Sequence, residues 1–113
     1  METVVCQLVD GPPGADRPLR TYFSELVSRR GDGPSGLMLS LICQEIEAPG
    51  NFVLVTGWRS PEDLAAVVSN VGADFDAQIA GAGATYHRFV GQTRYDSLIQ
   101  SGVQKLAADA PSD

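Results

Sequence analysis

Residues 49–64 have the sequence PGNFVLVTGWRSPEDL, and this stretch decides the fold because a turn, a strand and the start of a helix follow one another in it. Residues 52–58 are rich in the apolar and β-branched types that strands favour. Ser60 is a preferred helix cap, Pro61 suits the first helical position, and Asp63 stands where a capping box needs a carboxylate. We therefore expect a strand that leads directly into a helix.

The expected helix continues along an apolar stripe of helical spacing, formed by Leu64, Val67, Val68, Val71, Phe75 and Ile79. Gly72 interrupts this stripe, so we expect a bend or a split into two helices near it. Residues 81–83, Gly-Ala-Gly, end the helix, and residues 84–90 are expected to form the next strand.

The first part of the chain predicts a strand and then a helix. Residues 3–9 are apolar and β-branched, and the turn at residues 10–14 ends them. Asp16 is expected to cap the following helix, which Gly31 and Gly33 end. Its apolar stripe consists of Leu19, Tyr22, Phe23, Leu26 and Val27.

Residues 36–47 are expected to form a strand that the turn at residues 48–51 joins to the next strand as an antiparallel hairpin. The order is then β-α-β followed by β-α-β, which is the split β-α-β arrangement with strands in the order four, one, three, two. Cys6 and Cys43 fall on strands that the third strand separates, which excludes a disulfide between them. Both are expected to be buried, unreactive thiols.

These elements predict a single α+β domain over residues 1–113, a ferredoxin-like sandwich, with a short helix available near residues 98–106 and a frayed end at residues 107–113. Two helices cover only one face of such a sheet, and the other face is also largely apolar. A second copy of the sheet is the simplest cover, so we expect a homodimer.

The chain has a formal net charge of −6, and its basic residues are scattered, with Lys105 the only lysine. A nucleic-acid partner is therefore not expected. The apolar runs are far shorter than the roughly 20 residues that span a bilayer, and no secretion signal begins the chain, so we expect a cytoplasmic protein without membrane contact. No phosphate-binding loop, dinucleotide fingerprint or metal-ligand cluster occurs, and no cofactor is indicated.

The string at residues 49–64, with the strand start at Ser35 and Gly36, resembles the antibiotic biosynthesis monooxygenase family, and with the element order the resemblance covers about residues 3–92. It implies a dimeric α+β barrel with a small-molecule cavity in each subunit between the sheet and its helices. Members of the family include cofactor-independent oxygenases that turn polycyclic phenols into quinones, haem-degrading enzymes, quinol oxygenases, and relatives that catalyse cyclisation or have no known chemistry. Many members have a histidine where this chain has Val67, so that residue's role cannot be transferred.

His87 and Arg88 on the expected fourth strand are the candidate catalytic residues. Because neighbours on a strand face opposite sides, only one of them is expected to meet the cavity. His87 would be a general acid or base for a phenol or enol, or else a histidine hydrogen-bonded at the sheet or dimer face. Arg88, like Arg59, would stabilise an enolate or carboxylate, or else form a surface salt bridge.

Four further residues are candidates for binding the substrate: Tyr22, Trp58, Asn70 and Tyr86. Trp58 would pack on a flat ligand and Tyr22 would turn its hydroxyl into the cavity, and packing in the core is the alternative for both. Asn70 would orient a substrate oxygen, and Tyr86 shares a strand face with Arg88.

Two functions follow from these candidates. One is a cofactor-independent enzyme of specialised metabolism that acts on an aromatic or polyketide-like molecule, either activating a phenol or enol for reaction with oxygen or guiding a cyclisation or rearrangement. The other is a non-catalytic protein that binds a ligand or supports a partner enzyme. A polar-lined pocket favours the first, and a pocket filled by Phe and Val side chains favours the second.

Overall fold

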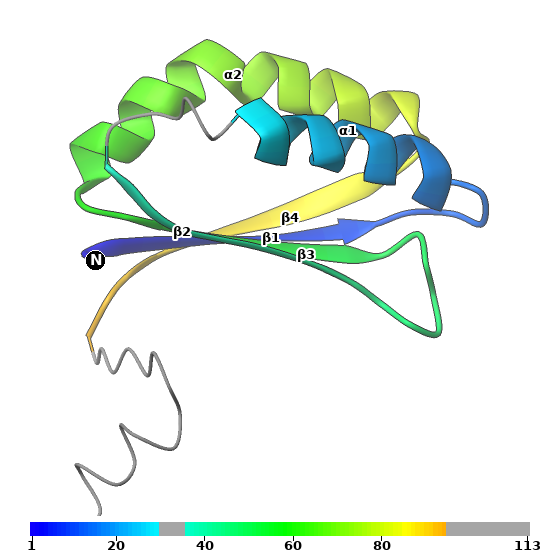
Figure 1. Ribbon diagram of the computed structural model, residues 1–113, viewed down its shortest axis with the longest axis horizontal. Helices are drawn as coiled ribbons and strands as arrows, with labels where there is room; N and C mark the ends of the chain where they lie inside the picture. The colour runs from blue at the N-terminus through cyan, green and yellow to red at the C-terminus, as the bar shows by residue number, and fades with distance from the viewer. Residues whose placement is uncertain (30–35, 95–113) are drawn as a thin grey trace, which may run out of the picture.

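The computed structural model describes residues 1–29 and 36–94, and its elements follow the predicted order (Figure 1). They are the strands β1 (Thr3–Asp10), β2 (Leu37–Gln44), β3 (Phe52–Trp58) and β4 (Thr85–Gln92) and the helices α1 (Asp16–Arg29) and α2 (Pro61–Gly81). The predicted helix stop at Gly31 and Gly33 and the predictions for residues 98–113 lie outside the described residues.

The strands form one antiparallel sheet in the order β2-β3-β1-β4. This is the predicted order read from the opposite edge, so the α+β, ferredoxin-like fold is confirmed. Both helices lie on the same face of the sheet (Figure 1). One face of the sheet is thus packed against helices, and the other carries none of the described helices.

The register of the strands decides which side chains share each face, because directly opposed residues point the same way. The face under the helices, here the covered face, carries Val5, Val9, Phe52, Leu54, Tyr86 and Arg88. The opposite face, here the open face, carries Cys6, Leu8, Val53, Val55, His87 and Phe89. His87 and Arg88 therefore lie on opposite faces.

The hydrophobic core lies between the helices and the covered face. It consists of Val9, Ala15, Leu19, Tyr22, Phe23, Phe52, Leu54, Phe75, Ile79 and Ala84. Leu19 of α1 and Ile79 of α2 are exposed by only 1% and 2%, so the predicted stripes supply the core residues of both helices, although Val27, Val68 and Val71 of these stripes are exposed. Phe23 packs edge-on against Phe52 with ring centroids 5.0 Å apart, which joins α1 to β3.

Helix α2 begins as predicted and runs without the expected break. Ser60 has extended backbone angles (φ −151°, ψ 160°), and its Oγ accepts a hydrogen bond from the Asp63 N–H at 3.3 Å. The prediction of a bend or split at Gly72 is wrong, because α2 is one helix of 21 residues. A single glycine costs a helix only about 1 kcal/mol relative to alanine, and the burial of Phe75 and Ile79 after Gly72 outweighs that cost.

Two local predictions in the first half of the chain need correction. Asp16 is the first residue of α1 and not its cap, since Leu19 N–H already bonds to the Ala15 carbonyl at 3.1 Å. Its carboxylate still lies in the first turn, where the helix dipole favours it. The second strand ends at Gln44, earlier than expected, and an irregularity between Leu37 and Leu39 separates two residues that simple alternation placed on one face.

Neither cysteine is buried, contrary to the prediction. Cys43 is exposed and Cys6 is partly exposed, because both lie on the open face. Both are free thiols. Strand β3 separates β1 from β2, as predicted, and this is the reason for which a disulfide between them was excluded.

The open face is apolar and exposed in the single chain. Leu8, Leu41 and Phe89 are exposed by 49%, 52% and 58%. Such a continuous apolar surface is typical of an interaction site.

No helix within residues 1–29 and 36–94 combines the length and apolar character needed to cross a bilayer.

Candidate functional site

A cleft of about 100 Å³ lies between the first half of α2 and the covered face of the sheet. Its apolar wall comes from α1, α2 and β4 and consists of Leu26, Leu64, Val67, Val68, Val71, Gly72, Phe75 and Val90. The residues with polar atoms on its wall are Gln7, Tyr22, Trp58 and Arg88. Three sequence candidates, Tyr22, Trp58 and Arg88, are thus brought together in one place.

The cleft exists because α2 packs tightly on the sheet only along its second half. Phe75 and Ile79 are its buried residues, whereas Val68 and Val71 are exposed by 36% and 45% although they line the cleft. Val90 lies opposite the buried Val5 on the covered face and is nevertheless exposed by 53%. The first half of α2 therefore leaves a wedge open above the edge strand β4.

Arg88 is the one cationic residue among the described residues of this wall. It is half-buried and lies opposite Gln7 of β1, so an arginine and a glutamine occupy neighbouring positions on a mostly apolar surface. Backbone pairing on β1 and β4 fixes the positions from which both side chains project. This arrangement suits a flat apolar ligand with one negatively charged or strongly polar oxygen.

Trp58 and Tyr22 contribute mainly ring surface to the cleft. Trp58 is 4% exposed, and its indole N–H donates to Thr56 Oγ1 at 2.9 Å, so this donor is already used within β3. Tyr22 is 5% exposed, and its ring lies 6.1 Å from that of Phe75. Both residues belong to the packed layer and also border the cleft.

Tyr86 does not line the cleft but lies next to Arg88 on the covered face. Its hydroxyl donates a hydrogen bond to Asp76 Oδ1 on α2. That bond, and to a smaller extent burial, raises the pKa of Tyr86 above its ordinary value, while the nearby Arg88 guanidinium counteracts part of the rise. Sequence reasoning missed Asp76 because nothing local to that helix indicates its partner on β4.

His87 and Asn70 lie away from the cleft. His87 is exposed on the open face, where it lies opposite Leu8. Asn70 is exposed on α2 and is not part of the cleft wall. Gln7 was missed by sequence reasoning, although a polar residue in the middle of an apolar strand was an available signal.

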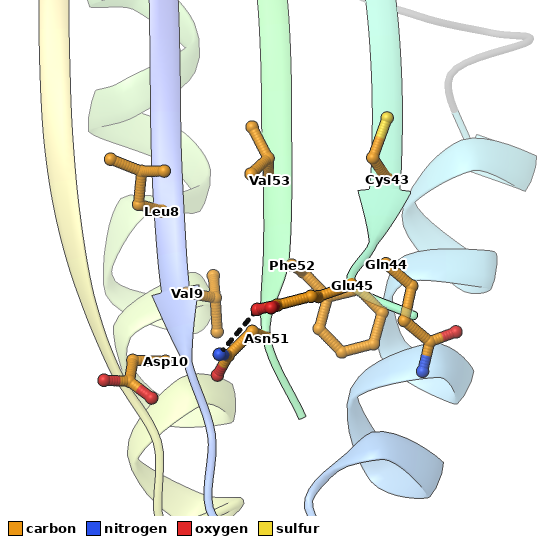
Figure 2. Close-up of a pocket in the computed structure, with 9 residues that line it drawn as sticks. All are labelled: Leu8, Val9, Asp10, Cys43, Gln44, Glu45, Asn51, Phe52 and Val53. Carbon is orange, nitrogen blue, oxygen red and sulfur yellow. Dashed lines mark hydrogen bonds between the residues drawn. The ribbon is translucent and has the colours of Figure 1, made fainter. Parts of the chain in front are cut away.

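A second, larger hollow of about 470 Å³ lies at the end of β1 beside the β2–β3 hairpin. Figure 2 shows Leu8, Val53 and Cys43 along one side of it, with the carboxylates of Asp10 and Glu45 at its rim. Asn51 orders this rim, since its Oδ1 accepts from the Gly11 N–H at 3.1 Å and its Nδ2 donates to Glu45 Oε1 at 3.0 Å. No residue of the described helices lines this hollow.

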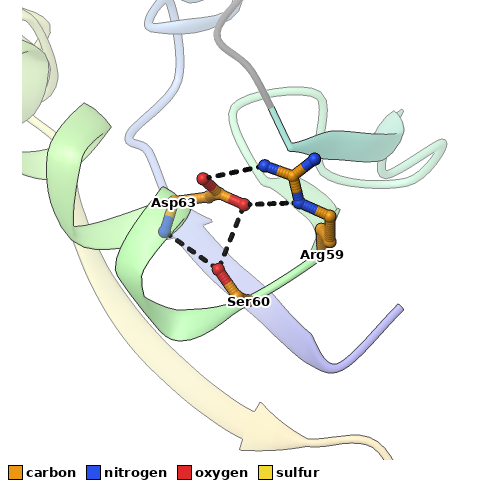
Figure 3. A network of polar contacts seen from close by, with 3 residues as sticks. All are labelled: Arg59, Ser60 and Asp63. Atoms are coloured by element: carbon orange, nitrogen blue, oxygen red, sulfur yellow. Dashed lines mark hydrogen bonds and ion pairs between the residues drawn. The ribbon is translucent and has the colours of Figure 1, made fainter.

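Arg59, the other arginine considered from the sequence, is engaged at the start of α2. Its Nε bonds to Asp63 Oδ2 at 3.0 Å, and the Ser60 hydroxyl donates to the same oxygen at 3.0 Å (Figure 3). The hydrogen bond from Arg59 holds the pKa of Asp63 below its ordinary value. The alternative of a surface salt bridge therefore applies to Arg59.

In the part of the chain that the structure describes, no group of three His, Cys, Asp or Glu residues is placed to hold a metal ion.

No protein-family model and no curated protein matches this sequence. Solved structures do match its fold. A protein of Deinococcus radiodurans assigned to the antibiotic biosynthesis monooxygenases has a TM-score of 0.73 and 14% identity, over 88% of this chain and 99% of that one. A protein of unknown function from Nitrosomonas europaea has a TM-score of 0.71 and 12% identity, over 86% and 93% of the two chains.

SnoaB, a cofactor-independent oxygenase from Streptomyces nogalater, matches with a TM-score of 0.66 and 14% identity, over 85% of this chain and 97% of that one. Identities this low show a common fold and carry no information on substrate. The resemblance read from residues 49–64 is therefore confirmed at the level of the fold: this chain has the fold of antibiotic biosynthesis monooxygenase-like proteins.

Proposed function

We propose that the chain binds a small aromatic or enolic molecule of specialised, polyketide-like metabolism in the α2 cleft and oxygenates it without a cofactor. The observation that carries this proposal is the half-buried guanidinium of Arg88 on an otherwise mostly apolar wall. A fixed cation beside apolar surface selects a flat ligand that carries a phenolate or enolate oxygen. The shared fold with a cofactor-independent oxygenase supports the same reading.

Arg88 would act on the ligand's charge. A guanidinium close to a phenol or enol favours its ionised form and lowers its pKa. The described wall contains no carboxylate or imidazole, so the released proton passes to water. The ionised ligand is electron-rich and held in place, which are the conditions for reaction with O₂.

The reaction balances without an external reductant. A ring C–H opposite the phenolic oxygen becomes a carbonyl, and the phenolic C–O becomes the other carbonyl of a quinone. One oxygen atom of O₂ enters the product, and the other leaves as water with the hydrogens lost from the ring carbon and the hydroxyl. The substrate supplies all the electrons that O₂ accepts.

The size of the cleft restricts the ligand. An apolar cavity of about 150 Å³ accepts benzene, so the 100 Å³ of this cleft is on the scale of a single ring. A polycyclic ligand requires the first half of α2 to move away from β4. That half packs loosely enough to do so, because its Val68 and Val71 are only partly buried.

The proposal includes a homodimer formed by the open face. Its exposed apolar residues Leu8, Leu41 and Phe89 belong to three strands and form a surface that two copies can share about a twofold axis. Sedimentation equilibrium at micromolar concentration should show about twice the 12.0 kDa mass of the chain. A species of chain mass alone would contradict the dimer.

A non-catalytic ligand-binding protein is the second candidate, and the composition of the cleft favours it. Four valines and a phenylalanine line the wall and leave little free volume. A cyclase or isomerase of the same fold would use Arg88 in the same way, on an enolate that attacks within its own molecule.

The proposal is tested by O₂ uptake and product mass with single- and two-ring phenols and cyclic β-diketones, without any added cofactor. We expect consumption of one O₂ per quinone formed, and a loss of about 10²-fold in turnover for Arg88→Ala. Binding of these compounds with neither O₂ uptake nor an isomeric product would instead support the non-catalytic candidate.

A further inference from the structure

The Tyr86 hydroxyl contacts a carboxylate on α2, and Tyr86 lies on the same face of β4 as Arg88 of the cleft wall. It donates a hydrogen bond to Asp76 Oδ1, and the Arg88 guanidinium is close enough to lower the pKa of Tyr86 slightly. Tyr86 and Arg88 are two residues apart on the covered side of β4, so their side chains project in parallel. Asp76 is exposed, Tyr86 and Arg88 are half-buried, and only Arg88 reaches the cleft.

The position of the Tyr86 ring does not depend on its hydroxyl. The ring packs edge-on against Phe75, with centroids 5.0 Å apart and planes at 90°. Phe75 is 7% exposed and is one of the residues that anchor α2. Removal of the hydroxyl alone therefore leaves the ring and the helix contact in place.

The chemistry of the three groups decides which of them donates a hydrogen bond to which. A phenol that donates its proton to a carboxylate keeps its oxygen lone pairs for an incoming donor, and the carboxylate makes that oxygen a better acceptor. Arg88 can donate from one edge of its planar fork to the Tyr86 oxygen while another edge faces the cleft. A long side chain that is already held loses less freedom when a ligand binds.

We propose that Tyr86 and Asp76 are positioning residues, which hold the Arg88 guanidinium at the cleft wall in the orientation that meets the ligand's oxyanion. This inference rests on the proposed function, since it takes the cleft as the site and Arg88 as the oxyanion partner. It makes the anion selectivity of the cleft depend on a carboxylate that lies outside it, on the surface of α2.

The test compares two probes of the same shape, p-nitrophenolate and the neutral p-nitrotoluene, by their dissociation constants. The wild-type protein should bind the phenolate about tenfold or more tightly than p-nitrotoluene, because a charge-assisted hydrogen bond to Arg88 forms only with the anion. A loosened cleft weakens both probes, whereas a misplaced guanidinium weakens only the phenolate. The ratio of the two constants thus separates positioning from a structural role.

Tyr86→Phe should lower phenolate affinity about tenfold and leave p-nitrotoluene affinity within about twofold of wild type. Asp76→Ala should act in the same direction. Asp76→Asn keeps an acceptor oxygen but removes the charge, so its phenolate affinity should lie between those of wild type and Asp76→Ala. This variant also replaces Tyr86→Phe in the test if Tyr86→Phe is poorly folded. Asp74→Ala is the matched control, because it removes an equivalent exposed carboxylate from the same helix and should change neither constant.

If Arg88→Ala removes the phenolate preference while Tyr86→Phe and Asp76→Ala keep it, the positioning inference is overturned and the proposed site stands. Equal loss of both probes in Tyr86→Phe also overturns it, since the role is then structural. If wild type shows no preference for the phenolate, or Arg88→Ala keeps that preference, the proposed function fails and the inference fails with it.

Discussion

The covered and open faces of the sheet are made by the same strands, yet they are suited to different tasks. On β3, Leu54 is 2% exposed under the helices, while its neighbour Val55 faces the open side and is half-exposed. On β4, Arg88 borders the cleft under α2, whereas His87 lies on a broad apolar surface. One residue of alternation therefore separates a side chain in the ligand site from one on an assembly surface.

This difference explains why the strands carry apolar residues on both faces of the sheet: each face packs against a different partner. The covered face has helices to fill it and leaves one wedge beside β4. The open face has exposed leucines and a phenylalanine that only another surface can cover. The following predictions use neighbouring residues as matched pairs to test this division.

The largest effect is expected from the packed layer. Leu54→Ala should lower the free energy of unfolding by about 2–5 kcal/mol, because it leaves a cavity that the surrounding rings cannot fill. In the dissociated single chain, Val55→Ala should cost about 1 kcal/mol or less, since its site is not enclosed there. Denaturant melts of the two variants measure the difference. Equal losses would mean that the faces are wrongly assigned.

The second effect separates the neighbours on β4. Arg88→Ala should reduce turnover, or phenolate affinity where no turnover is found, by about 10²-fold, while His87→Gln should change it by less than about twofold. Steady-state kinetics or equilibrium titration measures both variants. A larger loss for His87→Gln would move the chemistry to the open face.

The third effect concerns the open face. Leu41→Asp places a carboxylate on a surface that is expected to be buried between two copies, so the dimer should weaken by about tenfold or more. The monomer should remain folded, because Leu41 is 52% exposed in it. Sedimentation velocity gives the association state and circular dichroism gives the fold. An unchanged dimer would show that another surface forms the contact.

The smallest effect is expected at the start of α2, remote from both faces. Ser60→Ala removes the oxygen that accepts from the Asp63 N–H and the hydroxyl that donates to the Asp63 carboxylate. We expect a loss of about 1 kcal/mol in the free energy of unfolding. Melts indistinguishable from wild type would show that the Arg59 contact alone maintains the helix start.

The sequence predicted most of the fold, because its signals were local and strong. The cap at Ser60 and the alternation on β3 placed the central elements, and the strand order followed from them. The bend or split expected at Gly72 is absent, since the burial of Phe75 and Ile79 outweighs the low helix propensity of one glycine. The burial of Cys6 and Cys43 was also misjudged, because an apolar strand pattern does not reveal which face is covered.

The candidate site was predicted only in part, for a related reason. Alternation showed that His87 and Arg88 diverge, but it could not say which of them faces the helices. That choice depends on the register between β1 and β4, which places Arg88 opposite Gln7. The hydrogen bond from Tyr86 to Asp76 joins a strand to a helix residue ten positions earlier in the chain, and no local sequence pattern predicts it.

The central claim is that the ligand site lies on the covered face, with Arg88 as the oxyanion partner. A crystal structure of the protein with p-nitrophenolate tests it most directly. We expect the phenolate ring between α2 and β4, beside Val71 and Val90, with its oxygen at the Arg88 guanidinium. A phenolate bound instead on the open face, in the groove beside Leu8 and Val53, would contradict it.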